Sequence, residues 1–480
     1  MGVKVVKDLV HSYIEIDEVL QEIIDTPSFQ RLRRVKQLSC SYIFPSTNHT
    51  RYEHSLGVMQ LACEFFGVLE QDLKKNNISE EKIEYLKLHI KLAALMHDLG
   101  HPPFSHLGEK FLDKNEIFEN IKEYSELIDI EKTFLNMDGK IVGKEHELLS
   151  CYCILRKFYE KLKKINKDID ISFICRCIIG NLYVEEENWD KNICIQILNS
   201  DSIDVDKLDY LMRDNHMTGE IAPKMDIKRL LACLTISDKK LKYVAKAIPA
   251  VQSVVDSRDT LYLWVYHHHI SIYTDYVTGR ILKKCMELYE FERGRYIEEL
   301  NRQSFFSPKA IIDNFIADDD VYSHLRKIYV LSLEDRAHEF NNIAIKQLFE
   351  RKFLKSLWKT IYEYKDFADF LVESLVVESH EKLILKLKNE KNIEKITENL
   401  QKKLNLKEGE VFVITKYNKF YNSTKEAPIY LLLNEKDRQL SDLLPQKKFE
   451  KFHTMSFFVF VPKSFKNKAR EILIKELKNI

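Results

Sequence analysis

Glycine and proline are scarce in this chain. Its 480 residues include only 12 Gly and 10 Pro, and the stretch from residue 309 to residue 408 contains neither. Because these two residue types interrupt helices and form most tight turns, their scarcity argues against a fold of many short strands and favours long helices. We therefore predict a mainly α-helical protein.

The sequence also lacks long hydrophobic runs. Although 45% of the residues are hydrophobic, no uninterrupted apolar stretch approaches the roughly 20 residues that a helix needs to cross a bilayer. The N-terminal segment, MGVKVVKDLV, has neither the apolar core nor the small-residue cleavage site of a secretory signal. We expect no membrane partner and a cytoplasmic location.

An excess of charge of either sign is absent as well. Lys and Arg together number 74, and Asp and Glu together also number 74. A neutral chain has no global positive field that would hold a nucleic-acid backbone by charge alone. A nucleic-acid partner is therefore not favoured, and any phosphate-binding site must be built locally.

The C-terminal part differs in character from the rest of the chain. Residues 410–415, 429–433 and 456–461 are typical of strands, and residues 464–478 are typical of a final helix. The predicted domains are residues 1–300, a helical extension at 301–404 and a small α/β module at 405–480.

The densest chemical signal is the run HDLGHPPFSH at residues 97–106, which places three imidazoles and one carboxylate at the end of a predicted helix over residues 80–99. A carboxylate buried beside a neutral imidazole is costly unless a cation or hydrogen bonds compensate it. Histidine with aspartate suits Mn, Fe or Zn and, with more oxygen ligands, Mg. We therefore predict that His97 and Asp98 hold a divalent metal.

Two neighbouring ligands cannot close a coordination shell, so further ligands must come from distant sequence. His54 lies on the apolar stripe of a predicted helix that begins after residues 46–48, and Asp206 begins the polar stripe of a predicted helix over residues 202–214. Taken alone, His54 is an ordinary core histidine and Asp206 an ordinary surface ion-pair partner. Only their combination with the HD pair favours a common metal site.

The pattern H…HD…D, with the sequence around it, resembles the HD superfamily of phosphohydrolases. The matching segments are IIDTPSFQRLR at residues 23–33, KQL at 36–38, FP at 44–45, RYEHSLGV at 51–58, the run at 97–106, and IDVDKLDY at 203–210 followed by Arg213 and Asp214. Over about residues 1–300 the chain resembles the deoxynucleoside triphosphate (dNTP) triphosphohydrolases related to the SAM-and-HD-domain protein. The resemblance implies metal-dependent hydrolysis of dNTPs to deoxynucleoside and inorganic triphosphate, within an HD-domain helical core.

The resemblance also implies a role for individual residues. The implied metal ligands are His54, His97, Asp98 and Asp206. The residues implied to surround the scissile phosphate are His101, His106, Glu109 and His146. The implied substrate-binding residues are Gln37, Leu38, Arg51, Lys207, Tyr210, Asp214 and His267. The position of Glu109 is commonly Asp in the family, so this chain departs from the pattern there.

The cofactor that these ligands imply is a divalent metal. Fe, Mn and Mg all fit histidine with carboxylate, and Zn and Ni are also admitted, while Mg accompanies the nucleotide. A cation lowers the pKa of bound water, and a histidine near neutral pKa can donate a proton to a leaving oxygen. The physical chemistry therefore agrees with the implied roles.

A regulatory site is implied by a further set of matching positions. In relatives these positions bind an activating GTP or dNTP between subunits, which implies a homo-oligomer such as a tetramer. The residues are Lys4, Val5, Asp25, Gln30 and Arg33. Relatives carry a sequence motif similar to D-P-I-H-G nearby, whereas this chain has DLVHS at residues 8–12, without Pro or Gly. Ion pairing and helix capping are the alternative interpretation of Asp25 and Arg33.

Two alternative functions stay open at this point. The same metal site would serve a phosphodiesterase or nuclease that acts on single-stranded nucleic acid, a cyclic nucleotide or an alarmone. A nucleotide-sensing defence protein with weak turnover is the other alternative. The intact ligand set argues against that second alternative, because an idle site would be expected to lose its costly buried charges.

Overall fold

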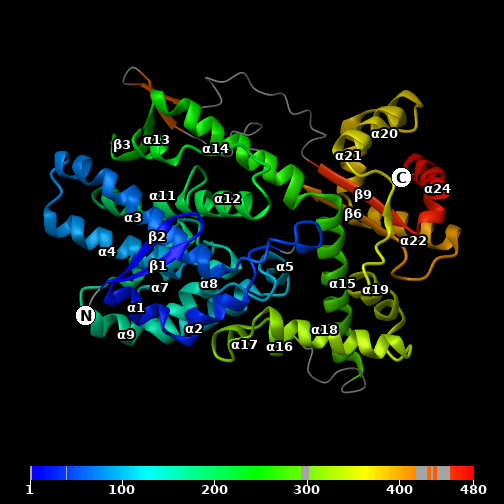
Figure 1. Ribbon diagram of the computed structural model, residues 1–480, viewed down its shortest axis with the longest axis horizontal. Coiled ribbons are helices and arrows are strands. Elements are labelled where there is room, and N and C mark those ends of the chain that lie inside the picture. The colour runs from blue at the N-terminus through cyan, green and yellow to red at the C-terminus, as the bar shows by residue number, and fades with distance from the viewer. Residues whose placement is uncertain are drawn as a thin grey trace. The chain divides into compact units, whose positions relative to one another are not determined.

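Helices dominate the computed structural model, which describes residues 3–38, 40–292, 302–417, 430–433, 436–439 and 455–479 (Figure 1). The strands form only small sheets of two, three and four strands. The prediction of a mainly α-helical fold is confirmed. Across the described ranges, no helix combines the length and the apolar character that crossing a bilayer would require.

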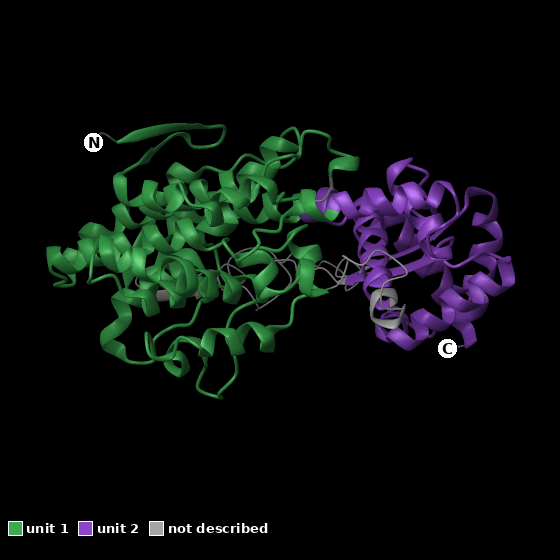
Figure 2. Ribbon diagram, turned by 90° about the horizontal axis from the view of Figure 1, so that it is seen from below, with its two compact units in different colours: residues 1–261, 302–321, 425–445 green, residues 262–301, 322–424, 446–480 purple. Residues whose placement is uncertain are grey.

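The chain divides into two compact units (Figure 2). The first unit comprises residues 1–261, 302–321 and 425–445, and the second comprises residues 262–301, 322–424 and 446–480. Compact units need not coincide with domains that fold separately. The predicted boundaries after residues 300 and 404 therefore stay predictions.

The first unit begins with an antiparallel hairpin of β1 (Lys4–Asp8) and β2 (Ser12–Ile16). Short helical segments follow it: α1 (Glu18–Ile24), α2 (Pro27–Gln30), η1 (Arg31–Arg34) and η2 (Cys40–Tyr42). The core helices are α3 (Arg51–Lys75), α4 (Glu80–Met96), α8 (Glu145–Cys153), α10 (Ile171–Ile179), α11 (Trp189–Leu198) and α12 (Val205–Met217). These helices bury the apolar faces that their sequence periodicity predicts.

The helices that carry the predicted metal ligands begin at local capping signals. Glu53 accepts a hydrogen bond from the backbone N–H of Thr50 at 3.1 Å, which fixes the start of α3. Asp204 accepts one from the backbone N–H of Lys207 at 2.8 Å, so α12 begins at Val205 rather than at the predicted residue 202. Helix α4 ends at Met96, before the HD pair and not at the predicted residue 99.

Shorter elements complete the first unit. The remaining helical segments are α5 (His106–Glu109), α6 (Lys114–Lys122), α7 (Ile130–Phe134), η3 (Ile154–Phe158), α9 (Tyr159–Ile165), η4 (Glu186–Asn188), α13 (Ile227–Leu231), η5 (Ala245–Ala247), α14 (Ile248–Leu261), α16 (Arg302–Phe305) and α17 (Pro308–Ile312). A four-stranded sheet has the order β3 (Leu234–Ser237), β4 (Lys240–Val244), β7 (Tyr430–Leu433) and β8 (Lys436–Gln439).

The second unit packs helices around a three-stranded sheet. Its helical segments are η6 (Tyr262–Tyr266), α15 (His269–Glu292), most of α18 (Asp318–Leu333), α19 (Glu339–Phe349), α20 (Ile361–Glu373), α21 (His380–Lys388), α22 (Glu390–Leu404), η9 (Lys463–Phe465) and α24 (Lys466–Asn479). The sheet has the order β5 (Lys355–Ser356), β9 (Met455–Val461) and β6 (Phe412–Tyr417).

All three strands predicted in the C-terminal part form, but they do not share one sheet. The strands predicted at residues 410–415 and 456–461 pair with each other as β6 and β9. The strand predicted at 429–433 becomes β7, which pairs in parallel with β4 of the first unit, with Val244 opposite Leu432. A pairing partner almost 200 residues away leaves no trace in the local pattern of the strand.

Candidate active site

The structure brings the predicted metal ligands together from three segments of the chain. His54 lies on α3, His97 and Asp98 directly follow α4, and Asp206 lies in the first turn of α12. Nε2 of His54 is 3.0 Å from an Asp206 carboxylate oxygen and 3.7 Å from an Asp98 oxygen. Nε2 of His97 is 3.4 Å from Asp98 and 3.8 Å from Asp206.

The two histidine rings in this set point the same type of nitrogen inward. Nδ1 of His54 donates to Asp209 at 2.8 Å, and Nδ1 of His97 donates to the carbonyl oxygen of Ala94 at 2.8 Å. Metal-bound histidines usually donate their second N–H to a carboxylate or a carbonyl in this way, which fixes the ring and its tautomer. Asp209 was not singled out by the sequence analysis; its signal is its place three residues after Asp206, where helical periodicity puts both on one face.

The residues present fit a divalent cation. Nε2 of His97 is buried and has no hydrogen-bond partner among the described residues. Donor atoms of His54, His97 and Asp98 all lie within 4.8 Å of one another. A buried nitrogen lone pair aimed at ionised carboxylates is the donor arrangement that a cation such as Mn²⁺ or Fe²⁺ uses.

Buried charge keeps the carboxylate of Asp98 ionised. Burial alone would raise the pKa of Asp98, but the Arg51 guanidinium and the nearby imidazoles of His97 and His101 outweigh burial and hold this pKa well below its usual range. Arg51 donates to Asp98 at 2.9 Å through one terminal nitrogen and to the hydroxyl of Ser105 at 3.0 Å through Nε. The arginine predicted to bind substrate phosphate therefore touches a predicted metal ligand.

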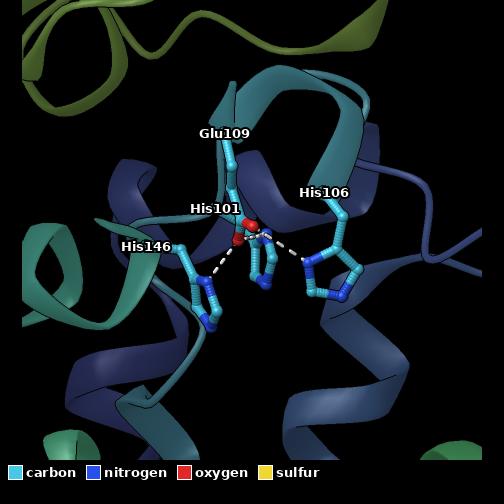
Figure 3. Close-up of side chains that lie close together, drawn as sticks. All are labelled: His101, His106, Glu109 and His146. Atoms are coloured by element: carbon cyan, nitrogen blue, oxygen red, sulfur yellow. Dashed lines mark hydrogen bonds and ion pairs between the residues drawn. The ribbon is translucent and has the colours of Figure 1, made fainter. Parts of the chain in front are cut away.

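A second group of side chains joins the predicted catalytic residues (Figure 3). The Glu109 carboxylate contacts Nδ1 of His146 and lies 3.1 Å from Nδ1 of His106. The rings of His101 and His146 stack with centroids 4.1 Å apart. Nε2 of His101 is 3.3 Å from Asp98, so this group adjoins the metal ligands.

The histidines of this second group differ in their affinity for a proton. Burial, with the positive charges of Arg51 and His146, holds the pKa of His101 well below its usual range. Burial alone would also lower the pKa of His146, but the Glu109 carboxylate outweighs burial and raises it. The pair of His146 and Glu109 can therefore hold a proton beside a neutral imidazole, which is the arrangement that a general acid requires.

Close packing fixes α8 against the HD segment. The hydroxyl of Ser150 donates to the carbonyl oxygen of His97 at 2.6 Å and accepts from the N–H of Gly100 at 2.8 Å. A Cβ atom at Gly100 would lie 2.5 Å from the carbonyl oxygen of His146, so only glycine permits this approach. The packing of α8 thereby sets the position of His146 relative to the HD pair.

Residues around 316–318 support the loop that follows the HD pair. Arg31 is buried and donates to the carbonyl oxygens of Leu99 at 2.9 Å, His101 at 2.7 Å and Ile316 at 2.8 Å. Asp318 accepts from the backbone N–H of Phe104 at 2.7 Å. Phe104 has a positive φ of 61°, a backbone conformation that is costly for a bulky aromatic residue unless the surrounding structure holds it.

The substrate-binding residues predicted in the first unit lie in three segments. Gln37 is buried and Leu38 half-buried in the segment before α3, and Arg51 begins α3. The others, Lys207, Tyr210 and Asp214, lie on α12. Lys207 donates to the carbonyl oxygen of Ser200 at 2.6 Å. Asp214 is buried and lies 2.7 Å from Nε2 of His49, a residue that the sequence analysis did not identify.

Tyr210 is half-buried on α12, between the turns that carry Asp206 and Asp214. His267 belongs to the second unit, where it is buried directly after η6. The predicted contact of His267 with substrate stays a prediction.

The predicted regulatory residues fall into two places. Lys4 and Val5 are exposed on β1. Gln30 accepts from Nε of Arg33 at 2.9 Å, and the Arg33 guanidinium lies over the ring of Tyr52 at 3.5 Å. Asp25 accepts a hydrogen bond from Gln21 at 2.9 Å. These contacts are hydrogen bonds to amide side chains and packing on a ring, and the regulatory role stays a prediction.

Comparison with known proteins finds one family whose pattern matches part of the chain. Residues 51–176 match the HD domain family. The chain is 33% identical over 297 residues to human deoxynucleoside triphosphate triphosphohydrolase SAMHD1. This aligned region covers 58% of this chain and 44% of the human protein. It is 31% identical over 290 residues to an uncharacterized protein of Methanocaldococcus jannaschii, which covers 59% of this chain and 50% of that protein. The matches span about half the length of these relatives.

Solved structures agree on the fold. A hypothetical protein from Aquifex aeolicus matches 98% of this chain with a TM-score of 0.64 at 23% sequence identity. A phosphohydrolase from Bacteroides thetaiotaomicron matches 96% of this chain with a TM-score of 0.64 at 19% identity. The predicted resemblance to HD-domain phosphohydrolases related to SAMHD1 is confirmed.

Proposed function

Because the chain carries an HD domain and resembles SAMHD1 over that part, we propose that it is a metal-dependent phosphohydrolase that cleaves dNTPs to deoxynucleoside and inorganic triphosphate. The observation that carries the proposal is the convergence of His54, His97, Asp98 and Asp206 beside the group around Glu109. The location in the cytoplasm is part of the same proposal.

In this proposal His54, His97, Asp98 and Asp206 hold the divalent cation. When bound, the cation polarises a phosphoryl oxygen and makes water a nucleophile at neutral pH. Which of Fe, Mn and Mg binds depends on which metal is available, because histidine and carboxylate ligands accept all three.

The group around Glu109 supplies the proton in this proposal. Nδ1 of His146 contacts the Glu109 carboxylate, which raises the pKa of His146, so the imidazole can carry a second proton and pass it to the leaving oxygen of the nucleoside. His101 stays neutral and lies between this pair and Asp98, where it can accept a hydrogen bond from water or substrate. The longer side chain of Glu109, compared with the Asp of relatives, contacts His146 and also lies within 3.1 Å of His106.

Arg51 and Lys207 are the cations that we assign to the triphosphate. Both lie within one helical turn of a metal ligand on the same helix, Arg51 before His54 and Lys207 after Asp206. Arginine matches two phosphate oxygens at once, whereas lysine acts as a point charge. Gln37, Leu38, Tyr210, Asp214 and His267 complete the proposed substrate site.

The test of this function is a product analysis. Metal-reconstituted protein is incubated with each dNTP, with and without GTP or a second dNTP, and inorganic triphosphate is separated from pyrophosphate and phosphate. Release of inorganic triphosphate is the expected result. Cleavage of an oligonucleotide or a cyclic nucleotide, with all dNTPs left intact, would instead favour the phosphodiesterase alternative.

Two variants separate metal binding from proton transfer in this assay. Asp206→Ala should lose both Mn²⁺ retention and turnover, because it removes a ligand. His146→Ala should retain Mn²⁺ and lose turnover by about 100-fold or more, the usual contribution of a general acid. Glu145→Gln, at the half-buried residue next to His146 in the first turn of α8, is the matched control and should keep both. Full turnover in Asp206→Ala would remove this residue from the proposed ligand set.

Activation and assembly form the last part of the proposal. We assign Lys4, Val5, Asp25, Gln30 and Arg33 to a site for GTP or a dNTP between subunits of a homo-oligomer. Sedimentation with and without GTP tests the assembly, and a rise in turnover on addition of GTP tests the activation. An oligomer whose turnover rate is unchanged by every added nucleotide would contradict the regulatory assignment.

A further inference from the structure

The turn of the N-terminal hairpin is built by its own side chains. Asp8 ends β1, and its Oδ1 accepts from the backbone N–H of Val10 at 2.8 Å and of His11 at 2.9 Å. Ser12, which begins β2, has a positive φ of 62°. This turn does without proline and glycine, and it directs the His11 ring away from solvent, leaving 5% of that side chain exposed.

The buried ring of His11 contacts α12. Its Nε2 donates to Oδ1 of Asp209 at 2.6 Å. Arg213, one turn further along α12, donates to Oδ2 of Asp209 at 3.0 Å and to Oδ2 of Asp8 at 2.9 Å. The side chains of Asp8, Asp209 and Arg213 are at most 7% exposed, so these bonds are shielded from water and strong.

Asp209 is shared between the hairpin and a predicted metal ligand. One of its oxygens accepts from His11, and the other accepts from Nδ1 of His54 at 2.8 Å. Helix α3 leaves room for this arrangement at Gly57, where a Cβ atom would lie 2.5 Å from Nη2 of Arg213. An unbroken series of hydrogen bonds therefore joins the turn of the hairpin to the ring whose Nε2 faces the other metal ligands.

We propose that Asp8 and His11 are positioning residues for His54, and that docking of the N-terminal hairpin and binding of a divalent cation stabilise each other. The inference rests on the proposed metal-binding role of His54. His11 and Arg213 hold Asp209 in the rotamer that fixes the His54 ring, so an undocked hairpin leaves that ring less well oriented. Linkage makes the effect reciprocal, because a cation that binds the oriented ring must favour the docked hairpin. The hairpin also carries Lys4 and Val5, so a ligand that binds this strand would act on the metal site through the same contacts.

The first experiment measures Mn²⁺ binding to the full-length protein without any nucleotide. His11→Ala removes the donor to Asp209 and should weaken Mn²⁺ binding by about 10-fold, the lower end of the range for groups that orient metal ligands. His11→Gln places an amide donor near the position of Nε2 and should restore most of the affinity. Lys7→Ala, an exposed residue of β1, is the matched control and should bind Mn²⁺ like the wild type.

The second experiment needs no change at the hairpin. Hydrogen exchange of the amides in residues 4–16 is followed in the wild type with and without Mn²⁺, and the expected result is slower exchange in the presence of Mn²⁺. Asp206→Ala should abolish that difference, because it removes a metal ligand that does not contact the hairpin. The proposal would be overturned if the wild type and His11→Ala bound Mn²⁺ with equal affinity. It would also be overturned if the wild type bound Mn²⁺ but hydrogen exchange in the hairpin stayed the same. Both readouts are independent of whether dNTPs are hydrolysed.

Discussion

Substitution of Asp318 by asparagine tests whether the loop after the HD pair is held by a buried carboxylate. Asp318 is 4% exposed and accepts from the backbone N–H groups of Phe104 at 2.7 Å and Lys36 at 3.0 Å. Burial nevertheless dominates and raises the pKa of Asp318 to about 6 from the ordinary value of 3.8. Asp318→Asn keeps the shape and one acceptor, but it cannot ionise.

The size of the effect follows from this pKa. A carboxyl group whose pKa is higher in the folded state binds its proton more tightly there, so its stabilising contribution is complete below the unfolded pKa of 3.8 and is lost as the pH rises through about 6. The difference between the two values corresponds to about 3 kcal/mol. The wild type should therefore lose about 2 kcal/mol of stability relative to Asp318→Asn between pH 4 and pH 8, with about 1 kcal/mol of that loss between pH 5 and pH 7.

Urea unfolding at a series of pH values measures this difference. Asp319→Asn is the control, because Asp319 is exposed in the same helical turn and pairs with Arg34 at 3.2 Å; its difference from the wild type should change by less than about 0.5 kcal/mol over the same range. A stability difference between wild type and Asp318→Asn that is the same at every pH would show that the carboxyl group is not the titrating group and would refute the reasoning.

Two further substitutions test the packing around the site. Gly57→Ala puts a methyl group within 2.7 Å of the carboxylate carbon of Asp209 and should lower the stability by about 1–3 kcal/mol in thermal unfolding. The control is Gly67→Ala on the same helix, which meets nothing within 4 Å and should raise the stability by about 1 kcal/mol. Equal effects of the two substitutions would contradict the close packing at Gly57. Arg31→Met leaves three backbone carbonyl oxygens without their donor and should cost at least about 3 kcal/mol in urea unfolding, so a loss below about 1 kcal/mol would show that water replaces the guanidinium.

The grouping of His54, His97, Asp98 and Asp206 as candidate metal ligands could be predicted from the sequence because their signals are local. The HD pair stands at the end of an apolar helical pattern, and His54 and Asp206 lie on helices whose caps and periodicity are evident. The group around Glu109 came from the resemblance to a family rather than from periodicity. The structure brings both sets together, and a single distance, 3.3 Å from Asp98 to His101, joins them.

The supporting contacts could not be predicted, because each joins segments far apart in the chain. Asp318 is 214 residues from Phe104, and Arg213 is 205 residues from Asp8. An aspartate at the start of a helix and an arginine on an amphipathic helix both have ordinary local explanations as a cap and a surface charge. Their actual partners are backbone N–H groups and buried carboxylates, which only the folded chain brings within reach.

The buried charges explain why this arrangement suits a cation. The acidic side chains joined by the contacts described above are Asp8, Asp98, Asp206 and Asp209, and the guanidinium groups among them are Arg51 and Arg213. Asp8, Asp98 and Asp209 are buried, whereas the side chain of Asp206 is 38% exposed. Three buried carboxylates facing two guanidinium groups leave a deficit of positive charge, and an uncompensated buried charge is costly. Hydrogen bonds to Asp206 and Asp209 outweigh the effect of burial and raise the pKa of His54 to about 9, so a second proton on the imidazole makes up part of the deficit until a cation displaces it from Nε2. A divalent cation between His54, His97, Asp98 and Asp206 would supply the missing charge at the point where the carboxylates meet. Arg213, which has Asp8 and Asp209 as partners, would then hold the hairpin without competing for that position.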